Sequence, residues 1–249
     1  MTYLEMMIYN KIKKLANKYM NNLHKSIDKR IEEMKSDNKD HYLIYEVLGV
    51  SDQEGDLIDL YQNKGRFLYK YAGSFLEEAT IICFKSAYPT AKKCRIENTL
   101  GSRPKTFEID CLFDKKAHEI KWRDATTDGD HITKEHTRIQ VISKKGYTPI
   151  RVMFFYPNRE QAKKIQDTLK TLYLGVGGQY YYGDDAWDYV YKQTGINLLK
   201  ILEKIANERK NNIKTLWLFR WIKRNKRSKC RLNLFRSSFL YTKNTNFKR

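Results

Sequence analysis

The sequence predicts an α/β core with additional helices before and after it. Two observations support this prediction. Apolar residues recur every three or four positions near the N-terminus and again beyond the middle of the chain, which is the period of amphipathic helices. Between these stretches lie short runs that alternate or are almost wholly apolar, as β-strands do. A chain of 249 residues is also long enough to bury a hydrophobic core.

The N-terminal region, residues 1–64, is predicted to be helical. Its apolar side chains keep a helical spacing from Leu4 to Ile31, with lysine, asparagine and glutamate between them. A polar run at residues 36–38 ends this pattern, and Gly49 ends a shorter one. We therefore predict helices over residues 3–35, 41–48 and 56–63.

The region 65–206 is predicted to form the α/β core. Its first helical stretch precedes TFEIDCLF and AHEIKWR, two strand-like runs that a turn at residues 114–116 joins into a hairpin. The later run PIRVMFFY is almost wholly apolar, as expected of a buried central strand. A glycine-rich stretch at residues 175–178 is predicted to be a loop. The predicted helices cover 66–84, 130–145, 158–173 and 184–207, and the predicted strands cover 106–113, 117–123 and 149–156.

The positive charge of the chain is concentrated at its C-terminal end. The sequence holds 48 Lys and Arg residues against 29 Asp and Glu, a net charge of +19. Residues 207–249 hold 14 of the basic residues and one acid, Glu208, so they carry +13 of that charge. Strong positive charge indicates a polyanionic partner, nucleic acid first. The basic segment 207–249 is either a DNA-binding arm or a disordered, aberrant extension, and the +6 on the remainder is a weak indication by itself.

The sequence argues against two classes of protein. No run of about 18 apolar residues is present, so no membrane-spanning helix is expected. The four cysteines form no CxxC pair, which argues against a zinc ribbon or a disulfide framework and for reduced thiols. We therefore expect a cytoplasmic protein that does not associate with a membrane.

The residues that can carry chemistry lie on the predicted hairpin. Glu119 and Lys121 are two positions apart on one strand, so their side chains point to the same face. Asp110 lies on the facing strand, within reach across the pair. The two carboxylates can hold Mg²⁺, which prefers oxygen ligands, and the lysine can orient a water molecule or help to deprotonate it. This pattern predicts attack of metal-activated water on a phosphodiester. The alternative is a hairpin with ordinary surface charges.

The stretch TFEIDCLFDKKAHEIKW, followed by a predicted helix and strand, resembles the PD-(D/E)xK nuclease superfamily, especially type II restriction endonucleases. The resemblance covers about residues 65–175. It implies an α/β core in which helices flank a mixed central sheet. It also implies that Asp110 is the metal-binding acid, with Glu119 and Lys121 as the acid and lysine of the ExK motif. Ile109 replaces the proline of the motif. The stretch KWRDATTDGDHITKEHTR further resembles ApaLI-type restriction enzymes.

In such enzymes a further acidic ligand often comes from the helix before the first strand. On a helical wheel Glu78 lies beside the apolar face of this helix, and Glu77 lies opposite. A glutamate that leans inward needs a partner, which a metal ion would supply. We therefore predict Glu78 as a metal ligand, with a simple salt bridge as the alternative. Glu77 and Glu108, which shares a strand face with Asp110, are the competing candidates.

The loop and helix that follow the catalytic strand are predicted to contact DNA. Basic side chains and the backbone N–H groups at a helix start bind phosphate. For each residue the alternative is a solvated or ion-paired surface position. The candidates are Arg123, Thr126, Thr127, Lys134, His136 and Arg138.

These patterns and the resemblance predict a Mg²⁺-dependent type II restriction endonuclease. By resemblance, such an enzyme belongs to a restriction-modification system and is a homodimer that cuts both strands of double-stranded DNA at a short palindromic site. The two-fold symmetry of a dimer would match a palindrome, and the N-terminal helices would support the dimer or wrap DNA. The alternatives are a repair or junction-resolving nuclease with the same core, and a non-catalytic, basic DNA-binding protein.

Overall fold

A computed structural model describes residues 2–123 and 129–211 of the chain. The chain divides into two compact units, Met1–Leu199 and Lys200–Arg249, and residues 198–211 are helical. The helices of the first unit are α1 (Tyr3–Met34), α2 (Tyr42–Val47), α3 (Asp52–Ala87), α4 (Gly129–Lys144), α5 (Glu160–Gly175) and α6 (Asp184–Thr194). Its strands are β1 (Lys92–Glu97), β2 (Thr106–Phe113), β3 (Lys116–Lys121), β4 (Thr148–Met153) and β5 (Gln179–Tyr182).

The strands form one mixed sheet in the order β1-β2-β3-β4-β5. The first three are antiparallel neighbours, whereas β4 and β5 run parallel to β3. Asp114 and Lys115 connect β2 to β3 with positive φ angles of 47° and 61°, the left-handed values that a two-residue hairpin turn requires. β3 reaches its parallel neighbour β4 through α4, because parallel strands need a long crossover. The strand with two of the predicted catalytic residues is therefore central, with a partner on each side.

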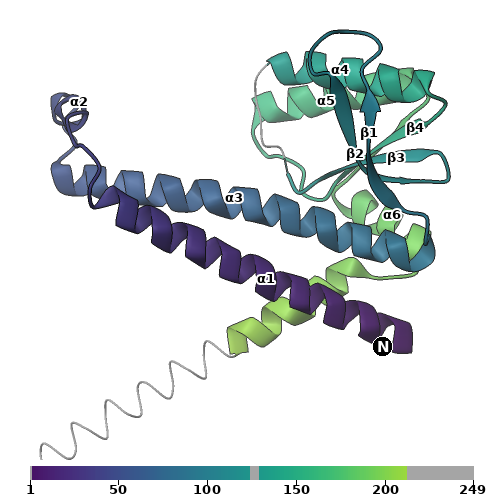
Figure 1. Ribbon diagram of the computed structural model, residues 1–249, viewed down its shortest axis with the longest axis horizontal. Helices are drawn as coiled ribbons and strands as arrows, with labels where there is room; N and C mark the ends of the chain where they lie inside the picture. The colour runs from purple at the N-terminus through teal and green to yellow at the C-terminus, as the bar shows by residue number, and fades with distance from the viewer. Residues whose placement is uncertain (1, 124–128, 212–249) are drawn as a thin grey trace, which may run out of the picture. The chain divides into compact units, whose positions relative to one another are not determined.

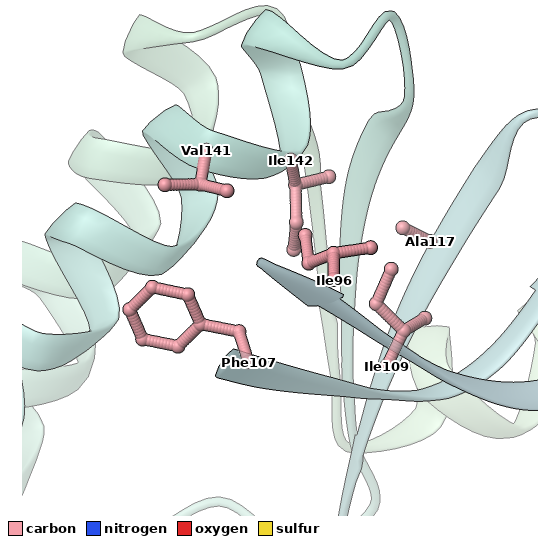
Figure 2. Packing of buried hydrophobic residues seen from close by; sticks show 6 residues of the cluster. All are labelled: Ile96, Phe107, Ile109, Ala117, Val141 and Ile142. Carbon is pink, nitrogen blue, oxygen red and sulfur yellow. The ribbon is translucent and has the colours of Figure 1, made fainter. Parts of the chain in front are cut away.

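Helices cover both faces of the sheet (Figure 1). Adjacent residues of β3 point to opposite faces of the sheet. On one face Ala117 packs in a cluster with Val141 of α4. On the other face the ring of His118 lies 4.8 Å from the ring of Phe84 in α3. Figure 2 shows the cluster under α4, which also contains Ile96, Phe107, Ile109 and Ile142. The sheet thus lies between two helical layers, as the sequence predicts for an α/β core.

α1 and α3 form an antiparallel pair (Figure 1). The ring of Tyr19 lies 6.1 Å from that of Tyr71 and 5.9 Å from that of Phe75, and the hydroxyls of Ser26 and Tyr71 are 2.8 Å apart. The C-terminal half of α3 continues into the core, where its buried residues pack on the sheet. One helix therefore belongs both to the N-terminal pair and to the core.

Several element predictions are confirmed, and others are corrected. Strand β2 has the predicted bounds, and the helix at the N-terminus ends within one residue of the prediction. The strand predicted over 117–123 occupies Lys116–Lys121 instead. The helix predicted over 184–207 is interrupted at Gly195, which has a φ of 70° and ends α6.

The two edge strands were not predicted from the sequence. β1 has the sequence KKCRIE, and its charged side chains are exposed. Charged side chains are common on edge strands, where they oppose pairing with another chain. β5 has four residues and directly follows the stretch 175–178 that was predicted as a loop. The helices predicted over 56–63 and 66–84 are parts of the single helix α3, so the expected boundary between residues 64 and 65 lies inside a helix.

In the described part of the chain, no helix is both long enough and apolar enough to cross a membrane.

Candidate active site

Asp110 and Glu119 meet where β2 and β3 separate. The last paired residues of the two strands at this end are Cys111 and His118. One step beyond them, Asp110 and Glu119 occupy facing positions. The backbone N–H of Ile120 donates to Asp110 Oδ2 at 2.8 Å, so the carboxyl group takes the place of a backbone acceptor. Both acids are buried, with 6% and 4% of their surface exposed.

A shift in strand register lies directly beside Asp110. Cys94 pairs with Ile109 but Lys92 pairs with Leu112, so two steps along β1 correspond to three along β2. Ile109 and Leu112 both pack against the cluster under α4, although residues three apart on a regular strand point to opposite faces. These observations identify a β-bulge, which bends a strand and changes the direction of its side chains. Asp110 lies within this bulge.

Both oxygens of Glu119 have cationic partners. Oε1 forms an ion pair with Lys121 Nζ, and Oε2 accepts a hydrogen bond from Arg138 Nη2 of α4. The side chain of Lys121 is 32% exposed and that of Arg138 is 10% exposed. Oε1 of Glu119 therefore lies on the open side of the site, and Oε2 lies on the interior side.

The three residues differ in their preferred protonation states. Burial and the neighbouring Glu119 carboxylate raise the pKa of Asp110 to about 8. Burial alone would raise the pKa of Glu119 too, but the attraction of Arg138 and Lys121 holds it well below its usual range. Burial opposes the charge on Lys121, yet Glu119 and Asp110 outweigh this effect and raise its pKa. At neutral pH, Asp110 is therefore mostly protonated, Glu119 is ionised and Lys121 is an ammonium.

The donor set of this site suits a hard divalent cation. Mg²⁺ prefers carboxylate oxygens and keeps several waters, so one or two acidic side chains are enough to bind it. A cation between Asp110 and Glu119 would remove the like-charge repulsion that contributes to the raised pKa of Asp110. Across residues 2–123 and 129–211, no group of three or more His, Cys, Asp or Glu side chains is arranged to hold a metal ion. The site thus offers two carboxylates.

Glu78, the predicted further ligand, belongs to the contact between α1 and α3. It accepts a hydrogen bond from the Tyr19 hydroxyl at 2.6 Å, and its carboxylate lies 3.8 Å from Lys18 Nζ. The structure therefore does not bring Glu78 to Asp110. This arrangement matches the alternative of a salt bridge. The helical wheel did not identify Lys18 and Tyr19 as the partners because it takes no account of the partner helix.

The two competing acids share a lysine. Lys93 Nζ lies 2.8 Å from the carboxylates of both Glu77 and Glu108, and Arg95 lies 3.4 Å from Glu108. The charge of Glu77 also helps to raise the pKa of Asp110. Of the three predicted candidates, Glu77 is thus the acid whose charge reaches Asp110.

A comparison with protein families identifies the chain. The family model for ApaLI-like restriction endonucleases matches residues 4–207, which is most of the chain. The chain belongs to this restriction endonuclease family. A search of curated proteins finds no match. Membership confirms the family predicted from the hairpin and the segment after it, and it makes the protein a nuclease that binds and cleaves DNA. The mixed α/β fold is consistent with such an enzyme.

The predicted DNA contacts of this restriction endonuclease have different environments. Arg123 is exposed, and its guanidinium lies 5.4 Å from the ring of Tyr69 and 5.6 Å from that of Trp122. Lys134 is exposed on α4, while His136 is half-buried and lies 3.0 Å from the Gln140 amide nitrogen. Two further candidates, Thr126 and Thr127, lie outside the described residues.

Arg138 does not occupy the surface position that was predicted for it. It is 8% exposed, and its two terminal nitrogens donate to Glu119 and Glu135. A guanidinium engaged in this way inside the protein has no face free for a phosphate. α4 turns this residue toward the sheet, a direction that the sequence alone does not indicate.

Three partners in this region were missed by reasoning from the sequence: Glu135, Arg151 and Tyr173. One indication was present, because Arg151 is the only charged residue in the apolar run PIRVMFFY. A charge in a buried strand requires a partner, and Arg151 is 2% exposed. Its register neighbour on β3 is Glu119.

Proposed function

We propose that this restriction endonuclease is a Mg²⁺-dependent type II enzyme with a PD-(D/E)xK core. It cleaves both strands of double-stranded DNA at a short palindromic site and leaves 5′-phosphate and 3′-hydroxyl ends. The observation that carries the proposal is the meeting of Asp110, Glu119 and Lys121 where β2 and β3 separate. A mixed sheet with helices on both faces also suits this type of core.

Asp110 and Glu119 would bind the cation through their carboxylate oxygens. When bound, Mg²⁺ supplies a Lewis acid for the phosphate and lowers the pKa of a coordinated water. The burial of both acids excludes competing bulk water from this side of the site. The Ile120 N–H donates a hydrogen bond to Oδ2 of Asp110 and fixes this oxygen. Oδ1 of Asp110 would then be the oxygen that binds the cation.

Lys121 acts in this mechanism as an ammonium ion. Its raised pKa, caused by Glu119 and Asp110, makes it a poor proton acceptor at neutral pH. We therefore assign it the orientation of the attacking water and the stabilisation of negative charge on the phosphate, in place of general-base catalysis.

Digestion of a plasmid of known sequence tests the proposal. We expect discrete fragments with Mg²⁺ and none with EDTA, and sequencing of the ends gives the recognition site. Asp110→Asn and Lys121→Ala should each lower the cleavage rate at least about 100-fold. The matched control is Glu108→Gln, an exposed acid on the same strand as Asp110, which should keep wild-type cleavage.

Other outcomes would favour the alternatives. A junction-resolving nuclease would prefer branched DNA to the plasmid. A non-catalytic protein would shift DNA in a gel without cutting it, and Lys121→Ala would then change nothing. Full cleavage by Asp110→Asn would show that the assigned site is wrong.

The homodimer is part of this proposal. Large apolar side chains are exposed on α2 and on the first part of α3, and such exposed surfaces mark protein–protein contacts. Light scattering should give the mass of two chains, and Leu48→Glu should reduce it to one without unfolding the protein. A monomeric wild-type enzyme that cuts both strands would contradict this assignment. The exposed apolar residues of this surface are Leu43, Ile44, Val47, Leu48, Leu57, Ile58 and Tyr61.

A further inference from the structure

A buried network of charges connects Glu119 with α4, β4 and α5. Arg138 joins two carboxylates, because its Nη2 donates to Glu119 Oε2 and its Nη1 donates to Glu135 Oε2 at 3.2 Å. Oε1 of Glu135 accepts from Arg151 Nη1 at 3.3 Å and from the Tyr173 hydroxyl at 2.5 Å. Every member of the network is buried.

Stability alone is a weak explanation for this network. Buried ion pairs lose hydration, and well-packed apolar side chains often stabilise a core as well or better. The Nε atoms of Arg138 and Arg151 are buried without a hydrogen-bond partner among the residues that the structure describes. Such unsatisfied donors add a further cost. The network therefore calls for a role beyond stabilising the core.

The shape of the guanidinium group suggests that role. Its nitrogens form a rigid planar fork, so an arginine held at one end presents the other end in a fixed direction. Glu135 holds one end of Arg138 and is itself held by Arg151 and Tyr173. The other end fixes the interior oxygen of Glu119, while the second oxygen stays on the open side next to Lys121.

We propose that Arg138 is a positioning residue for the cation site: anchored by Glu135, it fixes Oε2 of Glu119 so that Oε1 faces the cation beside Lys121. This inference rests on the proposed function, because it requires Glu119 to be a cation ligand. Residues that orient a metal ligand in this way affect metal affinity even though they do not touch the metal.

A titration of the full-length protein with Mn²⁺, without DNA, tests this role. Arg138→Lys keeps the positive charge and removes the fork. We expect this variant to bind Mn²⁺ at least about tenfold more weakly than the wild type. In cleavage assays with Mg²⁺, its kcat should fall while its KM for DNA stays the same, because Arg138 is buried away from DNA.

The control for loss of stability is Ile139→Val. Ile139 follows Arg138 in α4 and is fully buried. Its side chain packs against residues of α5 and makes no contact with Glu119 that the structure records. We expect this variant to melt at a lower temperature but to bind Mn²⁺ as the wild type does. If Arg138→Lys does not fold, the same titration is done with Glu135→Gln. This variant removes the anchoring charge but keeps the side-chain shape, and we expect it to bind Mn²⁺ more weakly than the wild type.

Three results would overturn the inference, and they can be told apart. If folded Arg138→Lys binds Mn²⁺ as tightly as the wild type, the network is only structural. The same conclusion follows from unchanged affinity in Glu135→Gln if that variant has to be used instead. Tighter binding would mean that Arg138 competes with the cation for Glu119. A wild-type protein that binds no Mn²⁺ would overturn the proposed function together with this inference, whereas the first two results leave the proposed function intact.

Discussion

At the scale of single residues, Asp110 lowers the stability of the fold that holds it. Burial and the Glu119 carboxylate raise its pKa from an ordinary 3.8 to about 8. The folded protein therefore binds this proton more tightly than the unfolded chain does. The stability associated with Asp110 is greatest below pH 3.8 and is lost as the pH rises toward about 8. At pH 7 most of this loss has occurred.

We accordingly expect Asp110→Asn to stabilise the protein while it abolishes cleavage. Asparagine keeps the shape of the protonated acid and can still accept from the Ile120 N–H. In EDTA at pH 7, the free energy of unfolding in urea should increase by a few kcal/mol. Glu108→Gln, which removes an exposed acid from the same strand, should give no such increase. A less stable Asp110→Asn protein would contradict this account.

His118 has the opposite relation between stability and pH. Its Nδ1–H donates to the Cys111 carbonyl at 3.0 Å, and its Nε2 accepts from the Tyr189 hydroxyl at 2.8 Å, which fits a neutral ring. Burial lowers its pKa from 6.5 to about 4. The unfolded chain takes up this proton first, so the stability that His118 contributes is complete above pH 6.5 and is lost as the pH falls toward about 4.

We expect His118 to cost the wild type about 2 kcal/mol of stability between pH 7 and pH 5. His118→Gln cannot take up a proton, so its loss over the same interval should be smaller by that amount. Urea unfolding of both proteins at the two pH values measures the difference. Parallel losses in the two proteins would show that another group is responsible.

At the scale of secondary-structure elements, α3 contains glycines with different surroundings. A Cβ atom at Gly73 would meet no atom within 4 Å, whereas one at Gly55 would lie 2.9 Å from the Tyr45 ring and 3.2 Å from the Tyr42 ring. Glycine inside a helix is less favourable than alanine by up to about 1 kcal/mol. Gly73, unlike Gly55, can therefore be replaced without a clash.

Gly73→Ala should stabilise the protein by about 0.5–1 kcal/mol, as measured by thermal or urea unfolding. Gly55→Ala is the matched control in the same helix. It gains the same helix propensity but must displace two tyrosine rings, so we expect no gain or a loss. An equal gain from both substitutions would mean that α2 does not pack on α3 as described.

The sequence predicted best the elements whose pattern depends on the core. β2 and the start of α1 follow the alternation or the helical period of buried residues, and both were predicted within a residue. β1 was not predicted because it has more charged than apolar residues, and β5 was not predicted because it has only four residues. A continuous α3 was not predicted because Gly65 lies between the two predicted helices, and glycine is a poor helix former.

The same distinction applies to the candidate site. Asp110, Glu119 and Lys121 were predicted to converge from strand alternation, and the structure brings them together. The β-bulge that contains Asp110 was not indicated by that alternation. The partners of Glu78 and Arg138 were not predicted because the directions of these side chains depend on which helix packs against which face. The sequence period does not contain that information.

At the scale of the whole molecule, the charge distribution and the family match divide the chain at the same place. The match covers residues 4–207, and the basic segment 207–249 begins where it ends. Residues 212–249 contain 12 Lys and Arg and no acid. Lysine and arginine bind DNA phosphates without regard to sequence, and each phosphate contact adds about 0.9 to the salt dependence of binding.

Removal of residues 212–249 should therefore leave site-specific cleavage intact and weaken non-specific DNA binding. We expect the slope of log K against log salt concentration to become shallower, as measured with a DNA fragment that lacks the recognition site. Cleavage of plasmid DNA by the same protein provides the control. An unchanged slope would identify the segment as incidental to DNA binding, and loss of cleavage would place part of the catalytic machinery there.

The tight turn between β2 and β3 bears on the order in which the site assembles during folding. A two-residue hairpin closes within about 1–10 μs because its contacts are local, whereas pairing of β3 with β4 must await the α4 crossover. Asp110 and Glu119 can thus approach each other early, but Arg138 and Arg151 join them from segments made later. We expect the acids to remain hydrated until β4 docks, so a nascent or partly folded chain would lack an ordered cation site and would not cut DNA.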